Sequence, residues 1–374
     1  MKMKISEKLK AKKEKKSSSG AITQQNLEES RVEIIAKGKK FKYPFQYAKY
    51  RLIIIAIVIG VVAIGTFAIV GWLQLYEAQN TSEVMYRFTK VLGLSVADVD
   101  GTKVRFSDYL MLYRSSIASV EHQQGKFDDS DTSKQQLAYY KRQALTAAED
   151  YSFAMQKLTE ADAAVTDVEI DEIIEEHKII DGEKRSDEAF EGIIRDNFGL
   201  SMKEYRRLIM LSLAKKKASV EFDTDAKELI GEIAEKLATN SDMEALATEY
   251  GENDAVSYEI VDNVEYLNLD SGRAATAAAL ENVGDVSNYF VSKNGDGYYI
   301  VKLSAKTDTT VSYESIWVRF KWLDTEMARL REEGKVTERI DLNVDEITDE
   351  SDADSTESDD AGAVDAEDAE AAGE

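Results

Sequence analysis

LIIIAIVIGVVAIGTFAIVGWLQLY, residues 52–76, is an apolar run without a single charged residue. A bilayer core is crossed by roughly 20 such residues, more than a signal-peptide core or a short buried helix contains. Backbone polar groups in hydrocarbon must be satisfied within the segment itself, which a helix achieves. The stretch Leu52–Leu75 therefore predicts one transmembrane helix, with the aromatic rings of Trp72 and Tyr76 at one headgroup layer.

The flanks of this run differ in charge. Residues 1–51 contain 15 Lys/Arg and 5 Asp/Glu, a net charge of +10, whereas the other flank begins with Glu77 and Glu83. Positive charge is retained in the cytoplasm, so the N-terminus is predicted to be cytoplasmic and the rest of the chain extracytoplasmic. A cleavable signal does not fit, because the basic region and the apolar run are too long and no small-x-small site follows. The predicted location is the plasma membrane, as a single-pass protein.

Composition excludes several kinds of function. The whole chain carries −24, which leaves −34 on residues 77–374. Such an acidic part cannot bind nucleic acid by neutralising phosphates, so no extracytoplasmic nucleic-acid partner is expected. The absence of cysteine excludes disulfides, thiolate nucleophiles and Cys-ligated metals. The two histidines, His122 and His177, are far apart in sequence and are interpreted as ordinary helix residues. No cofactor or metal site is predicted, and the acidic triplet Asp128, Asp129 and Asp131 is interpreted as a solvated loop rather than a calcium site.

The two ends of the chain are predicted to differ from the folded part. The basic tail 1–51 is interpreted as a partly disordered topology determinant, with binding to anionic lipid or RNA as the alternative. Residues 344–374 hold 14 Asp/Glu and no Lys/Arg. A segment with so little to bury is predicted to be disordered.

Residues 80–217 are predicted to be mainly helical. Asp100-Gly101 predicts a tight turn between strands 96–99 and 104–106. Ser107 is expected to cap the next helix, and apolar spacings of three and four over residues 137–158 predict a long one. Capping boxes at Thr166/Glu169, Ser201/Glu204 and Ser241/Glu244 predict three further helix starts, Ser186 and Gly199 bound another helix, and Lys215–Lys217 end the helix that starts at Ser201.

From residue 218 the pattern changes. A strand at Val220–Phe222 is followed by helices over 226–237 and 242–250, then by an extended run 257–267 and an Ala-rich helix 274–280. Strands 288–292 and 298–303 form a hairpin around Asn294-Gly295. The order β-α-α-β-α-β-β predicts an α+β domain with one mainly antiparallel sheet.

Several motifs together resemble a known family. Asp100-Gly101-Thr102-Lys103, Arg142-Gln143-Ala144-Leu145, Phe198-Gly199-Leu200-Ser201 and Glu204-Tyr205-Arg206 resemble the N-terminal module of the SurA, PrsA and PpiD foldases. Asp242 to Ala247, Gly284-Asp285-Val286-Ser287 and Gly297 to Leu303 resemble a parvulin (PpiC-type) domain. The resemblance covers residues 95–320 in the correct order and implies a chaperone module at 80–217 and a parvulin-like domain at 218–310.

The parvulin-like part departs from the pattern that the resemblance implies. The first strand has no histidine, Tyr299 stands where the last strand has one, and Met243 replaces the usual phenylalanine. Residues 218–310 contain no histidine at all. Rotation about a prolyl bond faces a barrier of about 20 kcal/mol, which an isomerase lowers in a dry, polarised pocket. An apolar slot built from Met243, Phe290 and Tyr299 binds a chain without supplying that chemistry, so the domain is interpreted as degenerate.

These features predict a membrane-tethered extracytoplasmic chaperone for unfolded or secreted polypeptides, close to the secretion channel. Client contacts are expected at Met243, Phe290 and Tyr299, and at Tyr109 and Tyr113 in the helical module. Residues 311–343 are expected to fold back onto that module as a strand and a helix. Two alternatives remain: an active peptidyl-prolyl cis-trans isomerase with an unusual pocket, and a scaffold for one dedicated partner in the cell envelope.

Overall fold

The computed structural model describes residues 24–41, 44–180, 182–240, 242–251, 254–268 and 270–342. The chain divides into two compact units between Gly71 and Trp72. The predicted acidic tail 344–374 and the first 23 residues of the basic tail lie outside the described residues. The fold class is α+β, as the sequence predicts, with small antiparallel sheets.

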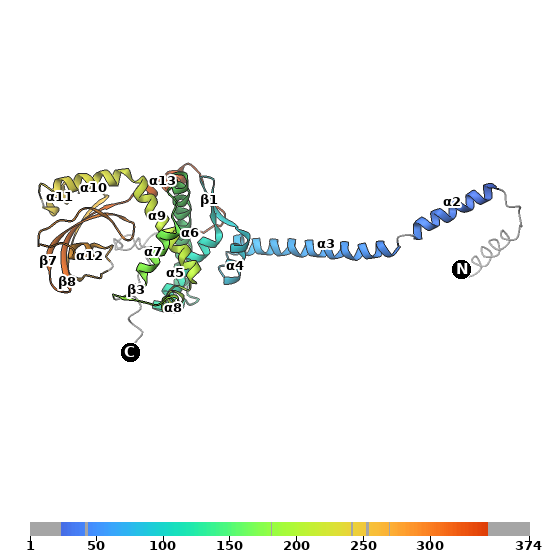
Figure 1. Ribbon diagram of the computed structural model, residues 1–374, viewed down its shortest axis with the longest axis horizontal. Helices are drawn as coiled ribbons and strands as arrows, with labels where there is room; N and C mark the ends of the chain where they lie inside the picture. The colour runs from blue at the N-terminus through green and yellow to red at the C-terminus, as the bar shows by residue number, and fades with distance from the viewer. Residues whose placement is uncertain are drawn as a thin grey trace. The chain divides into compact units, whose positions relative to one another are not determined.

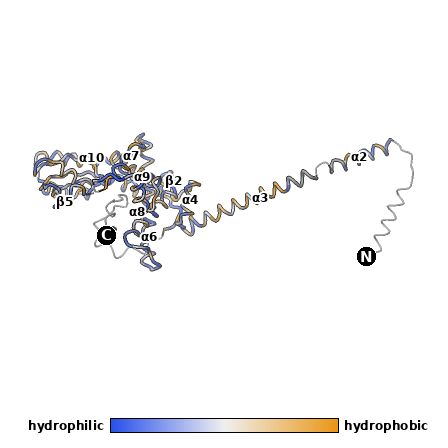
Figure 2. Tube along the Cα trace, turned by 60° about the horizontal axis from the view of Figure 1, so that its bottom comes forward, coloured by the Kyte–Doolittle hydropathy of each residue, from blue (hydrophilic) through white to orange (hydrophobic). Residues whose placement is uncertain are grey.

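The first unit contains two helices, α2 (Gln24–Phe41) and α3 (Pro44–Trp72) (Figure 1). The helix α2 was not predicted from the basic tail. The π-helical turn η1 (Leu73–Glu77) continues α3 at the start of the second unit. The stretch Tyr50–Glu77, 28 residues, is the one helix in the described part that is long and apolar enough to cross a membrane. At 1.5 Å per residue it measures about 42 Å, against about 30 Å for a bilayer core. Its hydrophobic character is continuous along α3 in Figure 2.

The second unit begins with a lobe that we call the helical lobe, residues 78–222 together with 322–342. Its helices and strands are α4 (Glu83–Leu92), β1 (Ser95–Val99), β2 (Thr102–Arg105), α5 (Phe106–Gln124), α6 (Asp131–Glu160), α7 (Asp167–His177), β3 (Ile179–Ile180), β4 (Glu183–Lys184), α8 (Asp187–Phe198) and α9 (Met202–Phe222). One hydrophobic core joins these elements apart from the short β3–β4 hairpin, and a smaller cluster lies between α6 and α9. A buried ion pair, Arg207 Nη2 to Asp108 Oδ2 at 2.6 Å, links α9 to α5.

Local signals placed most element ends of the helical lobe correctly. The turn at Asp100-Gly101 joins β1 and β2, and both residues have positive φ, 48° and 84°. The capping boxes at Thr166 and Ser201 are formed. The prediction for Ser107 is wrong, because α5 starts at Phe106 with Arg105 as its N-cap, two residues earlier than predicted, and the Phe106 N–H donates to the Leu94 carbonyl. Ser241 is not among the described residues, and Asp242 caps the helix after it.

The end of α9 differs from the prediction. Lys215–Lys217 do not terminate the helix, and Val220–Phe222 are not a strand, because α9 continues to Phe222. The reason is packing: Ala214 and Ala218, one turn apart, are buried against Ala154 and Leu158 of α6. Small side chains at this spacing let two helices approach closely, and the gain in burial outweighs the local signals for a helix end.

The sheet lobe, residues 223–321, holds a four-stranded antiparallel sheet in the order β5-β8-β7-β6. Its elements are α10 (Thr224–Leu237), α11 (Met243–Glu249), β5 (Val256–Glu265), α12 (Arg273–Ala278), β6 (Phe290–Val291), β7 (Gly297–Lys306) and β8 (Thr310–Arg319). α10 and α11 pack with one face of the sheet, and α12 packs with the other. The predicted hairpin of β6 and β7 is confirmed, as are the extended run and the Ala-rich helix.

The strand β8 corrects the prediction for residues 311–320. These residues were expected to return to the helical module, but they pair with β5 on one side and β7 on the other. Because helices pack on both faces of this sheet, a central strand needs apolar side chains on both of its faces. Val311 and Tyr313 of β8 are buried with α12, and Ile316 and Val318 with α10 and α11. The predicted strand at residues 220–222 is too short to take the place of the ten-residue β8 between its two neighbours.

Residues after β8 do pack on the helical lobe. The helix α13 (Trp322–Glu332) places Leu323, Met327 and Leu330 in the core of that lobe. The strand β9 (Val336–Glu338) then pairs with β1, so that the small sheet has the order β2-β1-β9. The chain therefore crosses between the two lobes twice, at residue 223 and at residues 320–322.

A buried carboxylate lies where α13 meets α6. Glu149 is 1% exposed, and one of its oxygens accepts from Arg331 Nη2 at 3.0 Å while the other has no partner in the described part. Burial raises the pKa of Glu149 to about 7, although Arg331 acts in the opposite direction. Burial also raises the pKa of the neighbouring Asp150, to about 6.

These raised pKa values predict how stability depends on pH. A carboxyl group that binds its proton more tightly in the folded state stabilises the fold fully below its unfolded pKa, and this stability is lost as pH rises through about 7. For Glu149 the loss amounts to roughly 3 kcal/mol between pH 5 and pH 8. Glu149→Gln should remove most of it. Urea unfolding of the parent protein and of the Glu149→Gln variant at a series of pH values measures the free energy of unfolding of each. If the two free energies changed with pH in the same way, the role of Glu149 would be refuted.

Candidate functional site

Three aromatic rings stack across one face of the sheet lobe. Phe290 of β6, Tyr299 of β7 and Trp317 of β8 are opposite one another in register. The ring centroids of Phe290 and Tyr299 are 6.1 Å apart, and those of Tyr299 and Trp317 are 6.0 Å apart at an interplanar angle of 8°. The structure therefore brings together two of the three residues predicted to form a slot, and it adds Trp317.

Met243 lies elsewhere. It is fully buried in the cluster on the opposite face of the sheet, with Ile230, Ile233 and Tyr298. Alternate residues of β7 point to opposite faces, so Tyr298 faces Met243 while Tyr299 faces α12. A slot made jointly by Met243, Phe290 and Tyr299 is thus not formed in the described lobe.

Two charged residues of this face were not found from the sequence. The Arg273 guanidinium lies over the rings of Tyr299 and Tyr313, at 5.2 and 5.8 Å from their centroids, and donates to Glu259. Asp270 accepts from the Ala274 N–H at 3.0 Å and from the Tyr313 hydroxyl. For Asp270 the sequence did offer a signal, because an acidic residue shortly before a predicted helix is typical of a helix cap.

The two tyrosine hydroxyls of this cluster are not general bases, whereas burial raises the pKa of the Asp270 carboxyl. Burial raises the pKa of Tyr299, and burial together with the hydrogen bond to Asp270 raises the pKa of Tyr313, so both hydroxyls stay protonated near pH 7. Tyr299 is 5% exposed and Tyr313 is fully buried. The cluster holds the Arg273 guanidinium against the rings of two buried tyrosines, Tyr299 and Tyr313.

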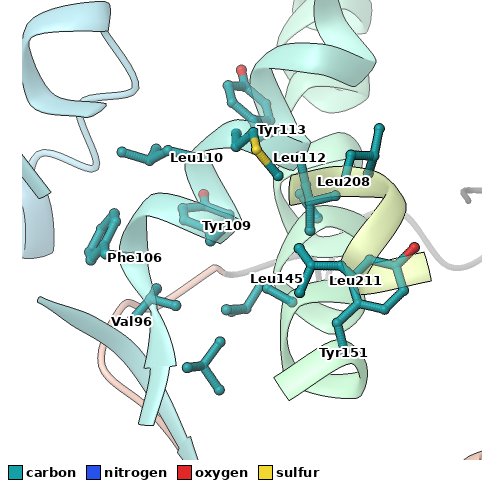
Figure 3. Packing of buried hydrophobic residues seen from close by; sticks show 14 of the residues in the cluster. Val96, Phe106, Tyr109, Leu110, Leu112, Tyr113, Leu145, Tyr151, Leu208 and Leu211 are labelled. Carbon is teal, nitrogen blue, oxygen red and sulfur yellow. The ribbon is translucent and has the colours of Figure 1, made fainter. Parts of the chain in front are cut away.

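The client residues predicted in the helical lobe are also core residues. Tyr109 and Tyr113 of α5 are 1% and 6% exposed. Figure 3 shows them in the buried cluster with Leu110, Leu145 and Leu208. The Tyr109 hydroxyl has no hydrogen-bond partner among the described residues. As described, neither ring is presented to a client.

An exposed apolar stripe on α4 was missed. Val84, Val91 and Leu92 are 68%, 84% and 53% exposed, and the half-buried Phe88 near them packs against the core of the lobe. The opposite side, with Tyr86 and Thr89, is buried in the lobe. The signal was available in the sequence: Val84, Phe88 and Val91 are spaced by four and three residues. Contiguous exposed apolar surface is typical of sites that bind protein chains or membranes.

Within the described ranges, no group of three or more His, Asp or Glu residues is placed to hold a metal ion. Asp128 accepts from the Ser133 hydroxyl at 2.6 Å and from the Ser130 N–H at 3.0 Å. The hydrogen bond from the Ser130 hydroxyl and these two bonds lower the pKa of Asp128 to about 2. Asp128 thus holds the start of α6 in place.

Comparison with known families gives one match. Residues 46–219 match the model of the SurA-like N-terminal domain. Comparison with curated proteins found no match, and neither did comparison with solved structures. The matched range includes the apolar helix and the helical lobe through most of α9, and it ends before the sheet lobe begins. The chain therefore contains, over residues 46–219, a region similar to the SurA-like N-terminal domain.

Proposed function

We propose that this protein is a membrane-tethered, extracytoplasmic chaperone that binds unfolded secreted or envelope polypeptides, with a parvulin-like sheet lobe that is not catalytic. The observation that carries the proposal is the similarity of residues 46–219 to the SurA-like N-terminal domain. Proteins with such domains are chaperone-like folding factors of the periplasm, which is the basis for the assignment.

The tether is part of the proposed mechanism. The apolar helix is long enough to span a bilayer, and the charge of +10 on residues 1–51 favours a cytoplasmic N-terminus. Both lobes then face the compartment into which secreted chains emerge. Tethering raises the effective concentration of a weak binder at that place without any additional contact.

The stripe on α4 is the client surface that we propose for the helical lobe. Its Val84, Val91 and Leu92 are exposed on a helix whose other side is packed into the core. An unfolded chain offers apolar side chains that can cover it. Tyr109, Tyr113 and Met243 are core residues, and we propose that they stabilise the two lobes rather than contact clients. Among the contacts predicted from the sequence, the half-buried Phe290 remains accessible.

Val91→Gln is expected to weaken client binding. Val91 is 84% exposed, so its replacement leaves the core untouched and removes apolar contact area worth about 1 kcal/mol, or about fivefold in affinity. The measurement is suppression of aggregation of several unfolded client proteins by the full chain in nanodiscs. Val283→Gln is the matched control, since Val283 is 66% exposed but lies in the sheet lobe.

An isomerase assay on the same nanodisc preparation separates the alternatives. A proline-peptide isomerisation rate at background, unchanged by Tyr299→Ala, is the expected result. A rate above background that Tyr299→Ala abolishes would establish the enzyme reading instead. If the chain protects none of the clients and captures a single folded envelope protein, it is a scaffold and the proposed chaperone function is lost.

A further inference from the structure

The outer edge of β5 is open. β5 is the terminal strand of the sheet order β5-β8-β7-β6, and in the described part of the chain no strand pairs with its other side. The Arg319 N–H donates to the Ala255 carbonyl, and residues 256–261 pair with 318–313 in continuous register. In an antiparallel pair, hydrogen-bonded residues alternate with residues whose backbone groups point away. Val256, Tyr258 and Ile260 therefore direct their N–H and C=O groups to the open edge.

A cavity lies beside the same residues. It is a shallow, open depression of about 530 Å³, lined by Tyr258 and Ile260 together with residues of β7, β8 and the start of α11. The strand thus combines unpaired backbone groups with a side-chain pocket on the same residues.

The charge of the cavity is negative. Asp242, Glu244 and Glu314 line it, and Lys302 is the cation among its lining residues. Lys302 Nζ is already paired with Glu314 at 2.9 Å. One oxygen of Asp242 accepts from the Ala245 N–H at the start of α11, and the Glu244 side chain is exposed. In the described part of the chain no ion pair is formed by Asp242 or Glu244, which favours a positively charged group in the cavity.

We infer that the β5 edge binds an extended basic segment of a client as an added strand, with a Lys or Arg side chain of that segment in the acidic cavity. Strand addition takes affinity from main-chain hydrogen bonds and specificity from pockets for alternate side chains. The inference deepens the proposed function and rests on it for the nature of the client. It assigns to the sheet lobe a binding role that needs no prolyl isomerisation.

A second copy of the chain is a poorer occupant of this edge. Residues 254–265 include Asp254, Glu259, Asp262 and Glu265 and no Lys or Arg. Two such strands side by side would bring like charges together, a device by which natural edge strands avoid pairing with themselves. A basic segment brings no such repulsion, because its cations meet a strand that carries acidic side chains and no Lys or Arg.

The test uses the full chain in nanodiscs and two nine-residue probe peptides, one alternating Val with Lys and one alternating Val with Glu. Fluorescence anisotropy should show the Lys peptide binding at least about tenfold more tightly, with an affinity that falls as salt is added. Amide hydrogen exchange should slow at residues 256, 258 and 260 when the Lys peptide is present. Equal binding of both peptides, or unchanged exchange at these amides, would overturn the inference.

Variants separate the edge from the rest of the lobe. Ile260→Pro removes an N–H that faces the open edge and spares the bonds to β8, and it should weaken the Lys peptide about tenfold, while Ile260→Val should not. Glu244→Gln should weaken it about threefold, whereas Glu281→Gln, an exposed acid outside the cavity, should have no effect. Exchange protection that grows with protein concentration without peptide would mean that a second copy occupies the edge.

Failure of this inference and failure of the proposed function give different results. A chain that suppresses aggregation of clients but binds neither peptide at β5 keeps the chaperone function and loses the edge site. A chain that binds the Lys peptide but protects no client loses the chaperone function and keeps the edge site.

Discussion

Asp223→Ala is expected to lower the free energy of unfolding by about 5 kcal/mol, because it leaves three backbone N–H groups without an acceptor. One oxygen of Asp223 accepts from the Ala226 N–H at 3.0 Å and caps α10. The other accepts from the Lys321 N–H at 2.6 Å and the Trp322 N–H at 2.9 Å. The side chain is 5% exposed, so water cannot replace it.

The position of Asp223 explains the size of the effect. It lies where the chain crosses from the helical lobe to the sheet lobe, and it binds the segment where the chain crosses back. Urea unfolding of the detergent-solubilised chain, followed by tryptophan fluorescence, measures the loss. Asp242→Ala is the matched control, because Asp242 is an exposed cap with one such bond and should cost about 1 kcal/mol. Equal costs for the two variants would show that the crossing is not held by Asp223.

Gly297→Ala is expected to cost about 4 kcal/mol, more than a usual overpacked site. A Cβ on Gly297 would approach the Trp317 indole nitrogen and the Val318 carbonyl oxygen to well below 3.0 Å. The Val318 carbonyl is part of the backbone of β8. Because β8 is paired in register with β7, this carbonyl cannot move without breaking that pairing. The Trp317 indole is held against the ring of Tyr299. The aromatic stack of the sheet lobe is therefore possible because residue 297 has no side chain.

Gly231→Ala provides the opposite expectation. Gly231 lies inside α10, and a Cβ there meets nothing within 4 Å. Alanine in a helix interior is more favourable than glycine by about 1 kcal/mol, so this variant should be more stable than the parent chain. Thermal unfolding of the two glycine variants in the same detergent compares them directly. Loss of stability in both, by similar amounts, would contradict the steric explanation for Gly297.

Predictions from the sequence were accurate where the signal is local. The turn at Asp100-Gly101 and the caps at Thr166 and Ser201 depend on residues within four positions of each other, and all three are formed. The end of α9 was wrong because its continuation depends on contacts with α6, some 60 residues earlier in the chain. Capping and charge signals are each worth about 1 kcal/mol, which a well-packed helix interface exceeds.

The candidate site shows the same division. Tyr299 and Phe290 were predicted to lie together because a hairpin joins their strands, and they do stack. Met243 was placed with them on the strength of a resemblance, but the face that α11 covers is set by the whole sheet. Arg273 and Asp270 were missed because their partners, Glu259 and Tyr313, come from two different strands.

The sequence by itself determined the long apolar helix, the charge of its flanks, the turns and caps, and the α+β class. These features depend on hydrophobicity and on hydrogen bonds between residues close in the chain, and both are visible in the sequence itself. Only the tertiary structure decided that residues 310–319 form the central strand, that Asp223 joins the two crossings, and that the edge of β5 is open. Burial between distant segments sets these features, because the same apolar pattern fits several partners and the best-packed arrangement is the one that forms.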